Sequence, residues 1–274
     1  MDKVSVENAF LDVSDYARPA ARWLARRLAP TPVTPIHLTL AYTVVGCAAG
    51  ILFALHRWLP FAGGLLLLKS LLDAADGSLA RARRHPSRVG RFLDSVCDFV
   101  VMAAVFGGIA FSAWSQTGQT FYWGLAAAAL LCATLQGSVY SYYYVRYREE
   151  TRGDQTSRVG ESAPEGYTWD HPTLLRCLYA LYRLIYGWQD ALMVRIDHWA
   201  APSGGVRLRP AFLTTVSVLG LGTQLAVIAL CAAIGQPTWA LWLFNTVFNF
   251  YWLALIAVRC LSGRLAPTHN SGAC

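Results

Sequence analysis

The chain has 274 residues, of which 55% are hydrophobic and only 14% are charged. Too few residues are charged to give the chain a water-soluble surface of ordinary charge density. The composition therefore indicates an integral membrane protein. The net charge of +7 is what an excess of Lys and Arg in cytoplasmic connections produces on a polytopic protein, and it also favours anionic lipid headgroups. Nucleic acid is therefore not needed as a partner to explain the charge.

The first 35 residues form a polar and amphipathic segment before any apolar run. Residues 5–29 interleave apolar and aromatic side chains with Arg18, Arg22, Arg26 and Arg27, so we expect a basic helix lying on the inner leaflet. The prolines of "PTPVTP" then turn the chain into the membrane. Because the N-terminus is polar, we expect no cleavable signal peptide.

Six apolar stretches are long enough to cross a hydrocarbon core of about 30 Å as helices. The connections near 56–60, 115–119 and 235–237 together hold one basic residue, Arg57, so the positive-inside rule places both termini in the cytoplasm. In the first stretch, Gly46 and Gly50 form a GxxxG pattern that more often marks close packing within a chain than a dimer seam. The predicted fold is all-α, a polytopic membrane protein with an N-terminal interfacial helix and six transmembrane helices near 36–58, 60–80, 91–114, 120–145, 211–234 and 238–260.

A long connection, residues 147–210, separates the fourth and fifth spans, and we call it the insert. It begins with a polar run and then changes character, because apolar residues recur at alternating spacings of four and three. We expect an amphipathic helix at the membrane interface or over the cytoplasmic mouth of the bundle. An accessory packing helix and an active-site lid are equally compatible with this stripe, which comprises Leu174, Leu178, Leu181, Ile185, Trp188 and Leu192.

The chain thus divides into an N-terminal segment (1–35), a catalytic core of four spans (36–146), the insert (147–210), the last two spans (211–262) and a tail (263–274). The core contains an unusual concentration of acid. Asp73 and Asp76 are three residues apart near the end of the second span, and Asp94 and Asp98 are four apart at the start of the third. Each pair lies on one helix face, so two antiparallel neighbouring helices can bring all four carboxylates to one pocket.

Four carboxylates in a partly dry pocket repel one another, and divalent metal resolves the conflict. Mg²⁺ or Mn²⁺ prefers such oxygen ligands, and two ions bridged by shared carboxylates would hold a pyrophosphate for phosphoryl transfer. Gly77 and Ala80 leave room for close approach, while Arg81 and Ser87 offer donors to a phosphate. Lys69, one turn before Asp73, either neutralises a carboxylate or extends toward water.

Written out, residues 73–98 give D-x-x-D-G-x-x-A-R-x8-G-x3-D-x3-D, which resembles the signature of the CDP-alcohol phosphotransferase family. The resemblance implies six membrane helices, an interfacial helix and usually a homodimer. It also implies that Asp73 and Asp94 bridge two Mg²⁺ or Mn²⁺ ions, that Asp76 completes the first, and that Asp98 completes the second and acts as general base. The implied CDP site comprises Thr39, Asp76, Gly77, Ala80, Arg81 and Ser87; the chain departs from many members at Ile36, where they have Asn.

The implied reaction transfers a phosphatidyl group from CDP-diacylglycerol to a polar alcohol at the cytoplasmic face of a bacterial inner membrane, releasing CMP. The stretch "YVRYREE" is similar to one in members that use inositol phosphate or related acceptors. Arg146 and Arg148 would then bind an acceptor phosphate, with Arg207 or Arg209 as partners, although topogenic charge explains these arginines equally well. We therefore expect a polyol or polyol phosphate, such as inositol phosphate or glycerol phosphate, as acceptor.

Four other functions stay open on the sequence. The reaction can run from a soluble CDP-alcohol to diacylglycerol, which also makes a phospholipid. A membrane prenyltransferase also binds pyrophosphate through carboxylates and Mg²⁺, but it does not need the Gly-x-x-Ala-Arg element. A cation transporter places its acids nearer the bilayer midplane, and an inactive lipid-binding relative does not need the complete acid set.

Overall fold

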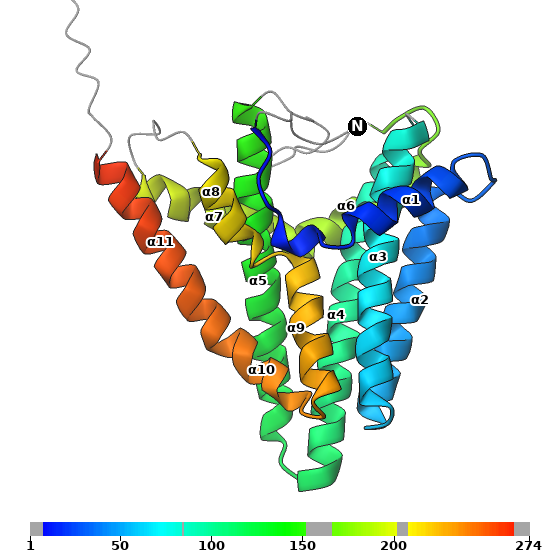
Figure 1. Cartoon of the computed structure of the whole chain (residues 1–274), viewed down its shortest axis with the longest axis vertical. Helices are drawn as coiled ribbons and strands as arrows, with labels where there is room; N and C mark the ends of the chain where they lie inside the picture. Colours follow the sequence, from blue (N-terminus) through cyan, green and yellow to red (C-terminus); the bar gives the residue numbers. More distant parts are fainter. Residues whose placement is uncertain (1–7, 84, 152–165, 202–207, 266–274) are drawn as a thin grey trace, which may run out of the picture.

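The computed structural model describes residues 8–83, 85–151, 166–201 and 208–265, and every regular element among them is helical (Figure 1). The prediction of an all-α polytopic membrane protein is confirmed. After a short turn, η2 (Val13–Asp15), and α1 (Arg18–Leu28), the long helices are α2 (Pro35–Ala54), α3 (Leu59–Arg83), α4 (Arg88–Thr117) and α5 (Phe121–Glu150). The insert forms α6 (Pro172–Tyr182), a π-helical turn η3 (Arg183–Gly187) and α7 (Trp188–Ala200), and the last elements are α8 (Pro210–Ser217), α9 (Leu221–Ala233), α10 (Thr238–Asn245) and α11 (Val247–Leu265).

Within the described part of the chain, five segments are long and apolar enough to cross a membrane: α2, α4, α5, the pair α8–α9 and the pair α10–α11. They correspond to five of the six predicted spans. The second predicted span corresponds to the helix α3, which packs against α1, α2 and α9. This helix is less apolar than the other five segments because it contains Lys69, Asp73 and Asp76.

The α1 helix lies across the end of the bundle and rests on α3 (Figure 1). Its small residues Ala21 and Ala25 pack against Ala75 and Leu79 of α3, while Trp23 stays 60% exposed. This is the amphipathic division that the sequence predicts for an interfacial helix. The chain then enters α2 through a capping box, in which the Thr34 hydroxyl accepts from the His37 amide.

Close approach of α2 and α4 depends on glycine. A methyl group added at Gly50 would lie 2.8 Å from the carbonyl oxygen of Ala104, and one at Gly46 would collide with Val101. Gly108 of α4 in turn faces the Gly50 carbonyl too closely for any side chain. The GxxxG pattern therefore serves packing within the chain, as predicted.

The helix predicted in the insert forms, and its apolar stripe divides between buried and exposed positions. Leu178 is buried, whereas Leu174, Leu181 and Trp188 are 47%, 44% and 46% exposed. The buried face instead carries Leu175 and several tyrosines, which pack against Val89 and Phe92 of α4. Apolar residues thus lie on two faces of the helix, and the predicted stripe includes positions on both.

Candidate active site

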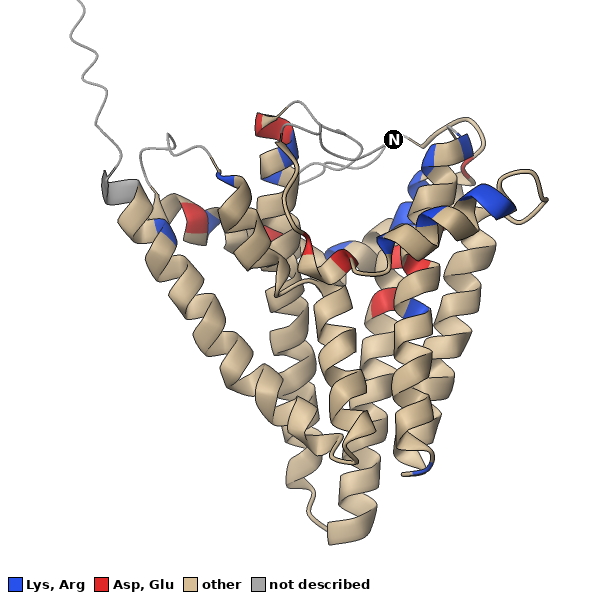
Figure 2. Ribbon diagram, viewed as in Figure 1, with Lys and Arg blue, Asp and Glu red and all other residues tan. Residues whose placement is uncertain are grey.

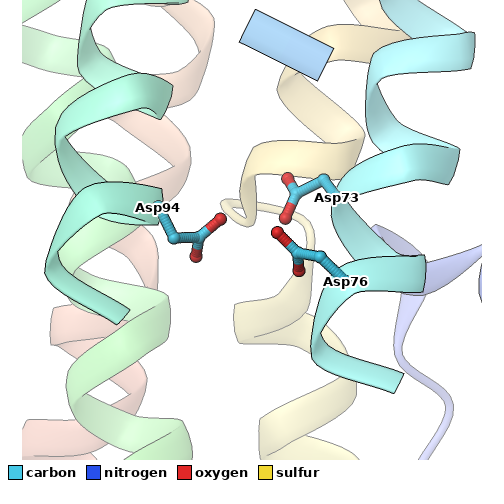
Figure 3. A group of neighbouring side chains, drawn as sticks. All are labelled: Asp73, Asp76 and Asp94. Atoms are coloured by element: carbon cyan, nitrogen blue, oxygen red, sulfur yellow. The ribbon is translucent and has the colours of Figure 1, made fainter. Parts of the chain in front are cut away.

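The helices α3 and α4 run antiparallel, and both pack against α2 (Figure 1). Ser87 begins α4 as its N-cap, with its hydroxyl accepting from the Gly90 amide at 3.0 Å. The carboxylates of Asp73, Asp76 and Asp94 consequently point toward one another from the two helices (Figure 3). One oxygen of each lies within 4.8 Å of the others, which is close enough for a shared cation.

Two side chains of α2 fix this group from the side. The Thr39 hydroxyl donates to Asp76 Oδ2 at 2.8 Å, and the Tyr42 hydroxyl donates to Asp94 Oδ1 at 2.7 Å. Both α2 residues are buried and share one helix face. Tyr42 was missed by sequence reasoning, although its spacing of three from Thr39 was an available signal.

Lys69 lies among the acids as a fixed counter-charge. Its side chain is fully buried, and its ammonium lies 2.5 Å from Asp73 Oδ2 and donates also to Asp98 Oδ1. The ring of Tyr42 covers the ammonium, with 4.3 Å between the nitrogen and the ring centroid. Of the two readings of Lys69, neutralisation of carboxylates is the one that the structure supports.

Asp73, Asp76, Asp94 and Asp98, which we call the acidic cluster, all line one cavity of about 2190 Å³. Gly77 permits the approach of Arg81, because an added methyl group would lie 3.3 Å from Arg81 Nη1. Excess negative charge on hard oxygen donors at the wall of a cavity is a donor set that fits Mg²⁺ or Mn²⁺. The cavity wall also includes every residue of the predicted CDP site, namely Thr39, Asp76, Gly77, Ala80, Arg81 and Ser87.

The opposite charge gathers at the mouth of the cavity, where basic residues crowd the α1 end of the bundle (Figure 2). Arg18, Arg22 and Arg26 of α1 contribute to the cavity wall. Burial alone would lower the pKa of Arg18, but the adjacent negative charge of Asp15 outweighs that effect and raises the pKa. The cavity therefore combines an acidic interior with a cationic entrance, an arrangement suited to an anionic substrate.

The insert covers part of this cavity. Asp170 accepts from the Ser87 hydroxyl at 2.7 Å and from the Arg88 amide at 2.9 Å, and Trp169 Nε1 donates to the Pro86 carbonyl at 3.0 Å. These bonds tie the segment before α6 to the turn that carries Ser87. Both functions considered for the insert helix, an accessory packing helix and an active-site lid, are compatible with these contacts.

Tyr186 of the π turn also lines the cavity, and its hydroxyl donates to the Ser95 carbonyl at 3.3 Å. Burial raises the pKa of Tyr186, and the negative charges of Asp98 and Asp94 raise it further. The insert thus extends to the neighbourhood of the acidic cluster. Sequence reasoning missed Asp170 and Tyr186, because no local pattern links them to a site more than 70 residues earlier.

The four arginines predicted to bind the acceptor have different surroundings. Arg148 is 4% exposed, lines the cavity and holds its guanidinium 5.0 Å from the ring centroid of Tyr144. Among the described residues, neither Arg146 nor Arg209 belongs to the cavity wall. Arg209 is exposed at the start of α8, and Arg207 lies outside the described residues.

Arg146 instead joins a second buried group, which we call the Asp197 cluster. Asp197 of α7 accepts from Arg146 Nη1, from Arg259 Nε at 2.9 Å, and from the hydroxyls of Tyr143 at 3.0 Å and Tyr142 at 3.1 Å. Asp197 is 3% exposed. The cluster joins α5, α7 and α11, so the insert is held to the bundle at this end as well.

The fold and the cavity together define a polytopic membrane protein with a buried acidic site that suits the chemistry of phosphate esters. Residues 32–195 match the family model of CDP-alcohol phosphatidyltransferase. The match covers more than half of the chain, and the chain therefore belongs to this family of membrane-bound transferases of phospholipid biosynthesis.

Similar proteins include inositol phospholipid synthases. An archaetidylinositol phosphate synthase of Pyrococcus horikoshii is 34% identical over 137 residues, covering 50% of this chain and 66% of that protein. A phosphatidylinositol phosphate synthase of Mycobacteroides abscessus is 36% identical over 118 residues, 40% of this chain and 50% of that protein. The chain thus spans between half and two thirds of these relatives' length.

Among solved structures, phosphatidylinositol phosphate synthase of Mycobacterium tuberculosis with CDP-DAG bound is 21% identical. The superposition covers 82% of this chain and 94% of that one, with a TM-score of 0.37.

Proposed function

We propose that the protein transfers a phosphatidyl group from CDP-diacylglycerol to the hydroxyl of a polar alcohol and releases CMP. The observation that carries the proposal is the convergence of Asp73, Asp76 and Asp94 in a cavity that every residue of the expected CDP site also lines. A structural role is a poor explanation of this arrangement, because buried like charges are costly unless they bind something.

The acidic cluster would hold the divalent ions. Asp73, Asp76 and Asp94 would bind the first, and in the family pattern a second would add Asp98. A bound Mg²⁺ or Mn²⁺ would neutralise the diphosphate and stabilise the oxygen on which CMP departs. Thr39 and Tyr42 would keep the carboxylates in place by the hydrogen bonds described above.

The remaining steps belong to the chain's own residues. Asp98 would accept the proton of the acceptor hydroxyl, whose oxygen attacks the phosphorus that carries the diacylglycerol. The bond from that phosphorus to the CMP oxygen then breaks, and CMP leaves. Arg81 and Ser87 would hold the phosphates and the nucleotide, so that the reacting atoms are in line before attack.

We further propose a polyol phosphate as acceptor, with Arg148 binding its phosphate. Arg148 lines the cavity, whereas Arg146 pairs with Asp197 and Arg209 lies outside the cavity wall. The same face of α5 offers Thr134, Ser138 and Ser141 to the cavity, and hydroxyl groups suit a polyol. Inositol phosphate and glycerol phosphate are the candidates, and the names of the relatives favour the former.

The membrane arrangement that goes with this function has α3 as the sixth span and the site and both termini on the cytoplasmic side of a bacterial inner membrane. The gathering of Lys and Arg at the α1 end of the bundle supports this orientation (Figure 2). A homodimer is the assembly that we expect.

The test is CMP release by the purified protein with Mg²⁺, CDP-diacylglycerol and a panel of alcohols that includes both polyol phosphates. We expect release with one of them, and expect Asp98→Asn to abolish it while donor binding is retained. Undiminished turnover in this variant would refute the role of Asp98. Turnover only with a soluble CDP-alcohol and diacylglycerol would show that the donor and acceptor are reversed.

A further inference from the structure

The lysine among the catalytic acids has an unusual place. Lys69 is fully buried beneath the described wall of the cavity, while all four members of the acidic cluster line that wall. Its ammonium binds one oxygen of Asp73 and one of Asp98 and rests on the Tyr42 ring. With its side chain only 1% exposed, the ammonium is held inside the protein against these two carboxylates.

This contact separates Asp98 from the other three acids. Asp73, Asp76 and Asp94 each offer an oxygen within 4.8 Å of the others, and Asp98 does not belong to that group. Asp98 is instead bound to the ammonium through Oδ1. The structure therefore shows three carboxylates arranged around a common point and one held aside.

We propose that Lys69 takes the place of one divalent ion, so that without nucleotide the protein holds a single ion on Asp73, Asp76 and Asp94. In that state Lys69 holds Asp98 apart from the three ligands of the ion. The role of Asp98 as base rests on the proposed function. Lys69 is thus a positioning residue that divides the four acids between two tasks.

The ammonium weakens the attraction for a second ion. Two divalent cations would balance four carboxylates, but with the ammonium present one cation leaves a net charge of about −1 and a second would turn it into about +1. A second ion on Asp98 would also lie beside an ammonium bound to the same carboxylate, where the two positive charges repel. The diphosphate of the donor would change this balance, so the proposal concerns the nucleotide-free protein.

The experiment is a titration of the purified full-length protein in detergent with Mn²⁺, in which electron paramagnetic resonance measures the free ion. We expect one bound Mn²⁺ per chain in the wild type and two in Lys69→Met, which keeps an apolar side chain of similar length but lacks the ammonium. Arg209→Met is the control, because it removes a positive charge at a residue outside the described cavity wall, and it should bind one. Two bound ions in the wild type would overturn the proposal, and this result does not require that Lys69→Met folds.

Variants of the acids provide a second readout. Asp98→Asn should leave the affinity for the single Mn²⁺ nearly unchanged, whereas Asp94→Asn should weaken it by about tenfold or more. Equal weakening in both variants would show that Asp98 is a ligand, against the proposal.

The two proposals fail differently in these measurements. A wild type that releases CMP but binds two Mn²⁺ would contradict the role of Lys69 and leave the proposed function intact. A protein that binds no Mn²⁺ and releases no CMP would contradict the proposed function, and the role of Lys69 with it.

Discussion

Two buried charged groups, the acidic cluster and the Asp197 cluster, differ in how well their charges are matched. In the Asp197 cluster a single carboxylate receives two guanidinium and two phenol hydrogen bonds. In the acidic cluster, the described contacts of four carboxylates include one ammonium, that of Lys69. A saturated buried charge ties elements together, whereas unmatched charge at the wall of a cavity is free to bind a ligand. The contrast predicts that the Asp197 cluster stabilises the fold and that the acidic cluster takes part in the chemistry.

The largest effect is expected from Asp94→Asn in the acidic cluster. Loss of one ligand oxygen from the triad should reduce CMP release by about a thousandfold, because a metal contributes several kcal/mol to the transition state of phosphoryl transfer. Thermal stability without metal should not fall, since the substitution removes one of several charges that repel. A variant with near-normal turnover, or one that unfolds at lower temperature, would contradict the assignment of this cluster to chemistry.

The opposite result is expected from Asp197→Ala. Removing the carboxylate leaves Arg146 and Arg259 without their shared buried counter-charge, which should cost about 3–5 kcal/mol of unfolding free energy. Denaturant unfolding in detergent measures this loss. Glu150→Gln is the control, because that carboxylate meets Arg146 nearer the surface and should cost at most about 1 kcal/mol. A cost for Asp197→Ala no larger than that of the control would contradict the structural role.

A smaller effect is expected from Arg148→Ala. Of the two arginines in "YVRYREE", Arg148 lines the cavity, whereas Arg146 pairs with Asp197. A charge-assisted hydrogen bond contributes about 1.5–3 kcal/mol, so KM for the phosphorylated acceptor should rise by about tenfold or more while KM for the donor stays constant. Arg209→Ala, outside the cavity wall, should change neither. A rise confined to the donor KM would place Arg148 at the nucleotide instead.

Much of the fold follows from local sequence. Five apolar runs gave their spans within a few residues, and the spacing of Asp73, Asp76 and Asp94 on two helices joined by a short turn was enough to predict that they meet. Helical spacing assigns a residue to a face but does not say which helix that face will contact. For this reason the buried face of α6 and the Tyr42 contact were missed.

The same limit explains why the sequence did not predict the partner of Arg146. Its motif suggested an acceptor site, but its partner Asp197 is 51 residues away in the sequence, beyond any local pattern. The carboxylate that decides the role of Arg146 lies in the insert, just beyond the residues that match the family model. Chemistry carried by a compact motif was therefore predictable, while tertiary pairing across the insert was not.

The most direct test of the central claim is anomalous diffraction at the manganese edge from crystals grown with Mn²⁺ and CDP. The account predicts a peak within coordination distance of Asp73, Asp76 and Asp94, in contact with the diphosphate. Bound CDP with no peak among these three carboxylates would contradict it.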